Sequence, residues 1–180
     1  VLASNVCQCF DCKQVIYTLG QYDGELVSVS DIMTSKEQSI VSREAFEIYA
    51  VNKEIDPMKY ILQLDAYSFY MMNILDYLVG NVDRHWGNWG FLVDNRKNKP
   101  LSLHPLMDFN QSFQMYDTIE GANCQPMLPL VISQKEAAID AVKKIGLNQT
   151  AEIDPAWFIG KEKEYDMLMK RLHILQSLKA

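Results

Sequence analysis

The chain has 180 residues, 48% hydrophobic and 22% charged, which suits one globular domain with a real core, or one domain plus part of another. Its formal net charge of −6 argues against a broad nucleic-acid-binding surface, because neutralising phosphates requires clustered Lys and Arg. Apolar runs are interrupted by Asp, Asn or Tyr well before twenty residues, so we expect no membrane span and no direct nucleic-acid partner.

The first twelve residues are expected to be helical, and they contain three of the four cysteines. Structural zinc sites favour paired Cys knuckles with two further ligands nearby, and here only Cys124 and scattered histidines remain. We therefore interpret the cysteines as buried free thiols of a cytoplasmic protein. The chain begins without Met or a signal-peptide pattern, and its apolar pattern starts in mid-element, so we expect it to be cut from a longer protein.

A β-hairpin is expected next. Two β-rich runs, 14–19 and 25–30, are separated by Gly20 and by Asp23-Gly24. The Asp-Gly pair is a strong turn signal between two such runs. After this hairpin the composition turns helical.

Two helices follow. Ser42 can cap a short one over residues 42–53. The second has the clearest signals of the sequence, because Asp56 can cap it, Pro57 occupies its first position and Gly80 ends it. Apolar residues recur along it every three or four positions, at Tyr60, Leu64, Tyr67, Met71, Ile74 and Leu78. A helix this apolar is expected to be largely buried, and it leads directly into a polar loop.

Beyond the polar loop the pattern predicts two strands, 89–94 and 100–108, joined by an exposed turn. Residues 109–131 show little periodicity and are expected to be irregular.

The rest of the chain is predicted to be helical. Ser133 with Glu136 three positions later forms a capping box, and Asp154-Pro155 opens a final helical region. A hairpin, then helices, a second hairpin and further helices indicate an α+β fold.

The polar loop GNVDRHWGNWGFL carries four polar side chains within six positions: Asp83, Arg84, His85 and Asn88. The strand pair that begins after Asn88 ends at Asp108, and a hairpin brings its two ends to the same place. The sequence therefore predicts that two carboxylates and one amide oxygen converge, although Asn88 and Asp108 are far apart in the chain.

Hard oxygen ligands of this kind suit Mg²⁺, which takes one or two carboxylates and completes its shell with phosphates and water. Phosphoryl transfer requires such a cation to neutralise charge on the phosphate, and a further group to orient the incoming hydroxyl. We therefore expect Asn88 and Asp108 to hold the metal and Asp83 to face the hydroxyl. Arg84 or His85 could steady the loop or stabilise charge on the phosphate.

The segments DYLVGNVDRHWGNWGFLVD and LSLHPLMDFNQSF resemble the catalytic region of HipA-like kinases. These are bacterial serine/threonine kinases whose fold is similar to that of protein kinases and phosphoinositide kinases. The family pattern runs Leu-Ile-Gly-Asn-x-Asp-x-His-x-x-Asn, followed by a strand pair and Pro-x-x-Asp. By this resemblance Asp83 is the catalytic aspartate, and Asn88 and Asp108 bind the metal. Phosphoinositide kinases share the Asp-Arg-His-x-x-Asn loop, but their metal aspartate generally follows a shorter hairpin.

The resemblance also implies a protein-kinase-like architecture. Residues 1–31 would be a remnant of the N-lobe (helix, hairpin and hinge), and residues 32–180 the mostly helical C-lobe with its catalytic hairpin. The hinge, which offers its backbone to the adenine of ATP, is expected at Val29, Ser30, Asp31 and Ile32. The family's Gly-rich loop and ATP-binding lysine would precede Val1, so we expect this segment to bind nucleotide weakly.

The resemblance implies a kinase that uses ATP and Mg²⁺ to phosphorylate a Ser or Thr hydroxyl of a protein substrate. Two alternatives stay open. One is a non-catalytic member of the same fold that binds another protein, such as the antitoxin partners that HipA-like proteins often have. The other is a lipid or small-molecule kinase of the same superfold, because the loop chemistry does not encode the acceptor.

Overall fold

The computed structural model describes residues 1–178 and confirms the α+β fold. Over these residues five α-helices accompany two small antiparallel sheets, one of strand order β1-β2 and one of order β3-β4-β5. The helices are α1 (Leu2–Cys7), α2 (Arg43–Asn52), α3 (Pro57–Val79), α4 (Gln134–Ile145) and α5 (Glu162–Gln176). The strands are β1 (Thr18–Tyr22), β2 (Glu25–Val29), β3 (Gln38–Ser42), β4 (Gly90–Asp94) and β5 (Lys99–Leu103).

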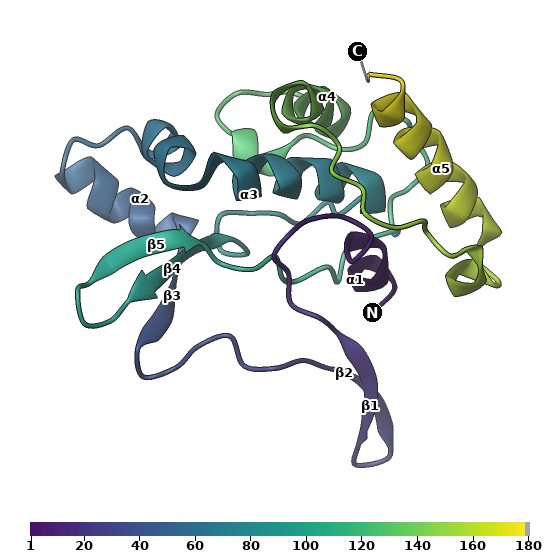
Figure 1. Cartoon of the computed structure of the whole chain (residues 1–180), viewed down its shortest axis with the longest axis horizontal. Helices are drawn as coiled ribbons and strands as arrows, with labels where there is room; N and C mark the ends of the chain where they lie inside the picture. The colour runs from purple at the N-terminus through teal and green to yellow at the C-terminus, as the bar shows by residue number, and fades with distance from the viewer. Residues whose placement is uncertain (179–180) are drawn as a thin grey trace.

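Figure 1 shows α3 across the middle of the molecule, with α4 above it, α5 at one end and α1 below. The three-stranded sheet lies with α2 at the opposite end. Two short 3-10 turns, η1 (Gln125–Met127) and η2 (Pro155–Phe158), interrupt the irregular segments before α4 and α5. No helix in residues 1–178 combines the length and apolar character needed to cross a bilayer.

Helix α3 is the centre of the core, as its apolar stripe predicts. The Asp56 carboxylate caps it by accepting a hydrogen bond from the Lys59 N–H at 3.0 Å. Gly80 ends it in the left-handed conformation, with φ at 61°. Every residue from 71 to 79 is buried. This end of the helix is therefore held firmly by the core, and it determines where the polar loop begins.

Helix α3 also has a kink at Asp65 that was not predicted from the sequence. The backbone there is non-helical, with φ at −158° and ψ at 66°. One oxygen of the Asp65 carboxylate accepts a hydrogen bond from the Ser68 N–H at 3.1 Å, and the other from the Leu103 N–H at 3.0 Å. Asp65 therefore caps the second half of α3 and ties it to β5.

The predictions for α2 and α4 are confirmed. Ser42 accepts a hydrogen bond from the Ala45 N–H at 3.1 Å and caps α2. Ser133 and Glu136 form the expected capping box of α4. Strand β3, which precedes α2 and pairs with β4, was missed because every one of its residues is half-buried and no alternation marks it.

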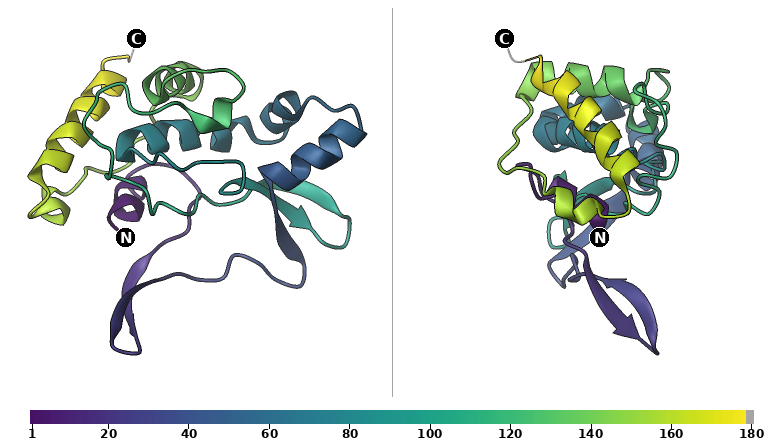
Figure 2. Two further views of the ribbon diagram at one scale, coloured as in Figure 1. Left: turned by 180° about the vertical axis from the view of Figure 1, so that it is seen from behind. Right: turned by 90° about the vertical axis from the view of Figure 1, so that its right-hand side faces the viewer.

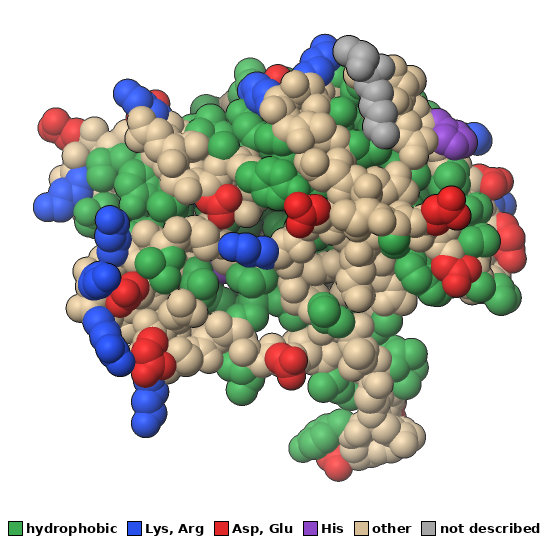
Figure 3. Space-filling model, in the orientation of Figure 1, with side chains coloured by type: hydrophobic (Ala, Val, Ile, Leu, Met, Phe, Trp, Pro, Cys, Tyr) green, Lys and Arg blue, Asp and Glu red, His purple; other side chains and the backbone are tan. Residues whose placement is uncertain are grey.

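The first strand of the hairpin begins four residues later than expected, at Thr18 and not at residue 14. The expected strand 14–19 overlaps β1 only at its end, whereas the expected strand 25–30 closely matches β2. The turn lies at Asp23-Gly24, as predicted. Gly20 lies inside β1 and does not break it. Figures 1 and 2 show the hairpin projecting from the body of the molecule. Apolar side chains are exposed on this hairpin: Leu19, Tyr22 and Leu26. Figure 3 shows hydrophobic side chains at the tip of the hairpin.

Residues 13–15 pair with a different part of the chain. The Val15 N–H donates to the Leu106 carbonyl at 2.8 Å, and the Leu106 N–H donates to the Lys13 carbonyl at 2.9 Å. The second strand of the hairpin after the polar loop, β5, accordingly ends at Leu103 and does not continue to Asp108 as expected. The segment that leads to Asp108 leaves the sheet and is anchored to the N-terminal part of the chain.

The N-terminal helix is shorter than predicted, because α1 ends at Cys7 and not near residue 12. All four thiols are free, and three of them are buried: Cys7, Cys9 and Cys124. Burial raises the pKa of Cys7 well above its ordinary value, since the charged thiolate is poorly solvated there.

Candidate active site

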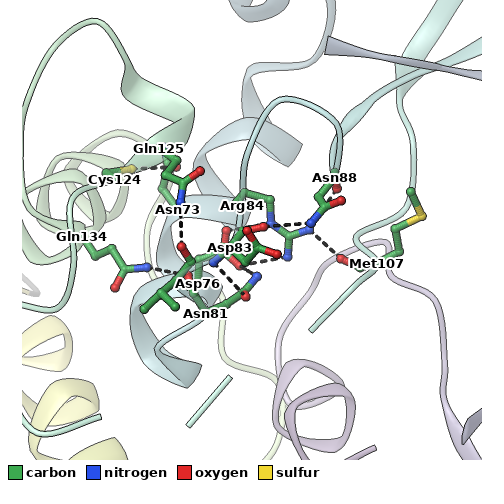
Figure 4. A network of polar contacts seen from close by, with 11 residues as sticks. Asn73, Asp76, Asn81, Asp83, Arg84, Asn88, Met107, Cys124, Gln125 and Gln134 are labelled. Atoms are coloured by element: carbon green, nitrogen blue, oxygen red, sulfur yellow. Dashed lines mark hydrogen bonds and ion pairs between the residues drawn. The ribbon is translucent and has the colours of Figure 1, made fainter. Parts of the chain in front are cut away.

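The polar loop is organised around the buried side chain of Arg84, which is 1% exposed. Its Nε and Nη2 each donate a hydrogen bond of 2.9 Å to the carboxylate of Asp76, in the last turns of α3. Its Nη1 donates to the carbonyls of Asn88 at 3.1 Å and Met107 at 2.5 Å. Figure 4 shows Arg84 between these three groups. One side chain thus joins the helix, the loop and the residue that precedes Asp108.

Of the two roles expected for Arg84, the contacts favour steadying the loop, because its guanidinium is buried and engaged by protein oxygens. Burial acts to lower the pKa of Arg84, but the charge and hydrogen bonds of Asp76 outweigh it, and the pKa is raised. Arg84 therefore stays charged and acts as a positioning residue. The sequence analysis named Arg84 among the catalytic candidates. In the structure its side chain is buried and contacts the backbone of Asn88 and Met107.

Asp108 lies directly after the carbonyl that Arg84 binds. Its backbone is in the left-handed region, with φ at 55°, which residues other than glycine rarely adopt. Its N–H donates to the Tyr17 hydroxyl at 3.4 Å. Such strained residues persist where the surrounding structure holds them, and they cluster at functional sites.

Asn88 is oriented by the loop itself. Its Nδ2 donates a hydrogen bond of 2.9 Å to the carbonyl of Asp83, so that within residues 1–178 its Oδ1 is left for a ligand. Over the same residues no three His, Cys, Asp or Glu side chains are grouped as a metal site. The candidate set is instead the Asn88 amide oxygen with a carboxylate of Asp108. This donor chemistry fits Mg²⁺, which binds through few protein oxygens and retains water.

His85 and Asp83 are the solvent-accessible members of the loop, with side chains 52% and 39% exposed. The Gly87 N–H donates to the His85 Nδ1 at 3.0 Å, so the neutral ring carries its proton on Nε2. That nitrogen lies 4.0 Å from Oδ1 of Asp83. A Cβ at Gly87 would lie 2.8 Å from the His85 ring, so only glycine leaves room for this ring position.

Three residues that sequence reasoning missed hold the loop from its other side. Asn81 donates through Nδ2 to Oδ1 of Asp76 at 3.1 Å. Gln134 of α4 donates to the Asn81 carbonyl, and Gln125 of η1 donates to the Val82 carbonyl, both at 2.7 Å. Figure 4 shows these contacts on the side of the loop opposite Asn88. Both faces of the loop backbone are therefore fixed by neighbouring elements.

A pocket of about 150 Å³ lies beside Asp108, and its lining residues come from the N-terminal part of the chain and from the segment after β5: Val1, Ser4, Tyr17, Ser28, Asp108, Phe109 and Asn110. The four expected hinge residues follow Ser28 directly in an exposed segment, where Val29 is 47% and Ile32 is 87% exposed. None of Val29, Ser30, Asp31 and Ile32 lines this pocket; Ser28, one position earlier, does.

No protein-family model matches the chain, and no curated protein sequence matches it. Among solved structures the chain is similar to the crystal structure of a Helicobacter pylori proinflammatory kinase, CtkA. The two are 18% identical and superpose with a TM-score of 0.71, over 98% of this chain and 77% of that chain. At this identity the likeness concerns the fold. The chain therefore has a kinase-like fold.

Proposed function

We propose that the protein is a HipA-like kinase that uses ATP and Mg²⁺ to phosphorylate a Ser or Thr hydroxyl of another protein. One observation carries the proposal: Arg84 binds the carbonyls of Asn88 and Met107 through a single nitrogen. This contact joins the loop that bears Asp83 to the segment that bears Asp108. Within a kinase-like fold, these are the groups that phosphoryl transfer requires.

Asp83 is proposed to orient the acceptor hydroxyl and to accept its proton, because its carboxylate is accessible and within residues 1–178 no Lys or Arg forms an ion pair with it. The Nε2–H of His85 points toward that carboxylate and helps to keep it oriented. Asn88 and Asp108 are proposed to hold Mg²⁺, which neutralises charge on the phosphate oxygens when it is bound.

The nucleotide is proposed to occupy the pocket beside Asp108. Its wall contains the hydroxyls of Ser28 and Tyr17, which are hydrogen-bonding groups suited to a polar ligand. Asp108 and Phe109 also line the pocket, next to the proposed metal site. The exposed segment 29–32 continues from Ser28, and its backbone is proposed to contact the base.

The substitution Asp83→Asn tests the proposal, because it keeps the shape of the side chain and removes its basicity. We expect kcat for transfer from radiolabelled ATP to proteins of a cell extract to fall by roughly 10²–10⁴-fold. Binding of Mg·ATP, followed by calorimetry, is expected to stay within twofold, because Asp83 does not hold the nucleotide.

The control is Asp166→Asn, an exposed carboxylate on α5, which is expected to leave both quantities unchanged. Equal turnover by Asp83→Asn and the unaltered protein would contradict the assignment. Transfer that persists after chelation of Mg²⁺ would contradict the metal role of Asn88 and Asp108.

A further inference from the structure

A second and larger hollow borders the catalytic loop at His85. It measures about 690 Å³ and is formed by three separate segments of the chain. Its lining residues are Glu44, Glu47, His85, Trp86, Gly87, Gln125, Leu128 and Pro129. We call this hollow the loop groove. His85 is the only residue of the proposed catalytic set in its wall, so the loop groove starts where the acceptor hydroxyl is expected.

One wall of the loop groove is acidic because the start of α2 is fixed to the catalytic loop. The Glu44 N–H donates to the Trp86 carbonyl at 3.0 Å, and the Arg43 N–H donates to the Trp89 carbonyl at 2.8 Å. These contacts bring the Glu44 carboxylate to the loop, with Oε2 3.9 Å from where a Cβ of Gly87 would lie. These backbone hydrogen bonds therefore hold the acidic wall in place beside the loop.

Glu44 is the acid of this wall that remains available for a ligand. Glu47 forms an ion pair with Arg43, whose guanidinium also stacks on the Trp86 ring at 4.6 Å. Within residues 1–178 no Lys or Arg forms an ion pair with Glu44, and the lining contains no basic residue besides His85. The loop groove therefore carries a net negative charge.

The opposite rim of the loop groove is apolar. Leu128 lines it and is 40% exposed, and the chain continues with Leu130 and Val131, which are 55% and 69% exposed. A hollow with one unpaired carboxylate and an apolar rim is complementary to an extended peptide with a cation and an apolar side chain.

We propose that the loop groove binds the acceptor segment of the protein substrate, and that Glu44 selects segments with Lys or Arg close to the acceptor Ser or Thr. This inference rests on the proposed function and adds the class of substrate. Oε2 of Glu44 lies 3.9 Å from where a Cβ of Gly87 would be, and the Gly87 N–H donates to Nδ1 of His85. Nε2 of His85 in turn lies 4.0 Å from Oδ1 of Asp83. Because an extended chain advances about 3.3 Å per residue, the selected cation lies within a few positions of the acceptor.

The test is binding of labelled peptides, measured by fluorescence anisotropy. Three ten-residue peptides share a central serine and a leucine, and differ only in carrying Lys, Gln or Glu beside the serine. The Lys peptide is expected to bind about threefold to fivefold more tightly than the Gln peptide, as for a partly exposed ion pair. Glu44→Gln is expected to remove this preference, and Glu44→Lys to reverse it in favour of the Glu peptide.

Glu152→Gln is the matched control, because Glu152 is exposed and its carbonyl contacts Cys9, just after α1, instead of the catalytic loop. This variant is expected to retain the preference for Lys. Equal binding of the three peptides, tighter binding of the Glu peptide, or a Lys preference that survives Glu44→Lys would each overturn the inference.

A parallel assay of phosphate transfer to the same peptides separates the two proposals. A Glu44-dependent Lys preference in binding, without transfer to any acceptor, would support the loop groove and reject the kinase assignment. Transfer to all three peptides at equal rates would support the kinase and reject the role of Glu44. Transfer that follows the order Lys, Gln, Glu would support both.

Discussion

Arg84 shows how one buried side chain can organise a polar loop. An isolated buried cation is costly, so a buried Arg needs a carboxylate and carbonyl partners in good geometry. Asp76 supplies the carboxylate, with a side chain that is 4% exposed. Two carbonyls supply the rest: that of Asn88 in the same loop and that of Met107 farther along the chain. The position of the proposed metal ligands therefore depends on a residue that touches neither metal nor substrate.

Asp76→Asn tests this dependence at the scale of one residue. It leaves Arg84 charged and buried without its counter-charge, and we expect the free energy of unfolding to fall by about 3–5 kcal/mol. Denaturant unfolding measures the change. The control is Asp140→Asn, which breaks the exposed pair with Lys144 on α4 and is expected to cost about 0.5 kcal/mol or less. Similar losses in the two variants would show that Arg84 does not need Asp76.

At the scale of elements, Asp65 connects the central helix α3 to the β4–β5 hairpin. A helix interrupted at one residue needs a new cap for its second half, and a strand end next to it needs a partner for its free N–H. The Asp65 carboxylate meets both needs, at Ser68 and at Leu103. The kink therefore directs β5 toward the segment that carries Asp108.

Asp65→Ala is expected to lower the free energy of unfolding by about 2–4 kcal/mol, because it removes a cap and leaves a half-buried N–H unpaired. Asp56→Ala is the matched comparison, since Asp56 only caps the exposed start of the same helix, and about 1 kcal/mol is expected. The measurement is urea unfolding of both variants. If Asp56→Ala proves the more harmful, Asp65 does not join helix and strand as inferred.

At the scale of the whole molecule, several Tyr hydroxyl and Cys thiol groups are neutral in the folded protein because their pKa values are raised. Burial raises the pKa of Tyr77 to about 12, although Arg171 acts to lower it. The Tyr77 hydroxyl donates to the Ile119 carbonyl at 2.9 Å, a bond that ionisation would remove. Burial also raises the pKa values of Cys12 and Cys124 to about 12. All of these groups ionise more readily when the chain is unfolded.

The consequence is loss of stability in alkali. Because the folded pKa values are raised, their contribution is complete below the ordinary values of 9.0 for Cys and 10.0 for Tyr, and declines as pH rises toward about 12. We expect the urea midpoint to be constant from pH 7.5 to about 9 and to fall steadily above it. Unfolding curves at successive pH values check this, and a midpoint unchanged at pH 11.5 would be inconsistent with it.

The sequence allowed the helices and the polar loop to be predicted because their signals are local. Ser42, Asp56 and Ser133 cap helices with bonds to residues three positions away, and Gly80 ends α3 through its own backbone. The hairpin that follows Asn88 is marked by turn residues within one short segment. The charge of Asp76 inside an apolar helix was an overlooked signal, because a buried carboxylate predicts a cation nearby.

By itself, therefore, the sequence determined where the longer helices lie, where the polar loop lies and what donor chemistry it offers, although it did not reveal β3. Only the tertiary structure decided that Arg84 is buried, that residues 13–15 pair with Leu106, and that Glu44 lies beside the polar loop. The physical reason is the distance along the chain between the groups that meet. Caps and turns satisfy backbone groups within a few residues, whereas these contacts satisfy groups that meet only when the whole chain has folded.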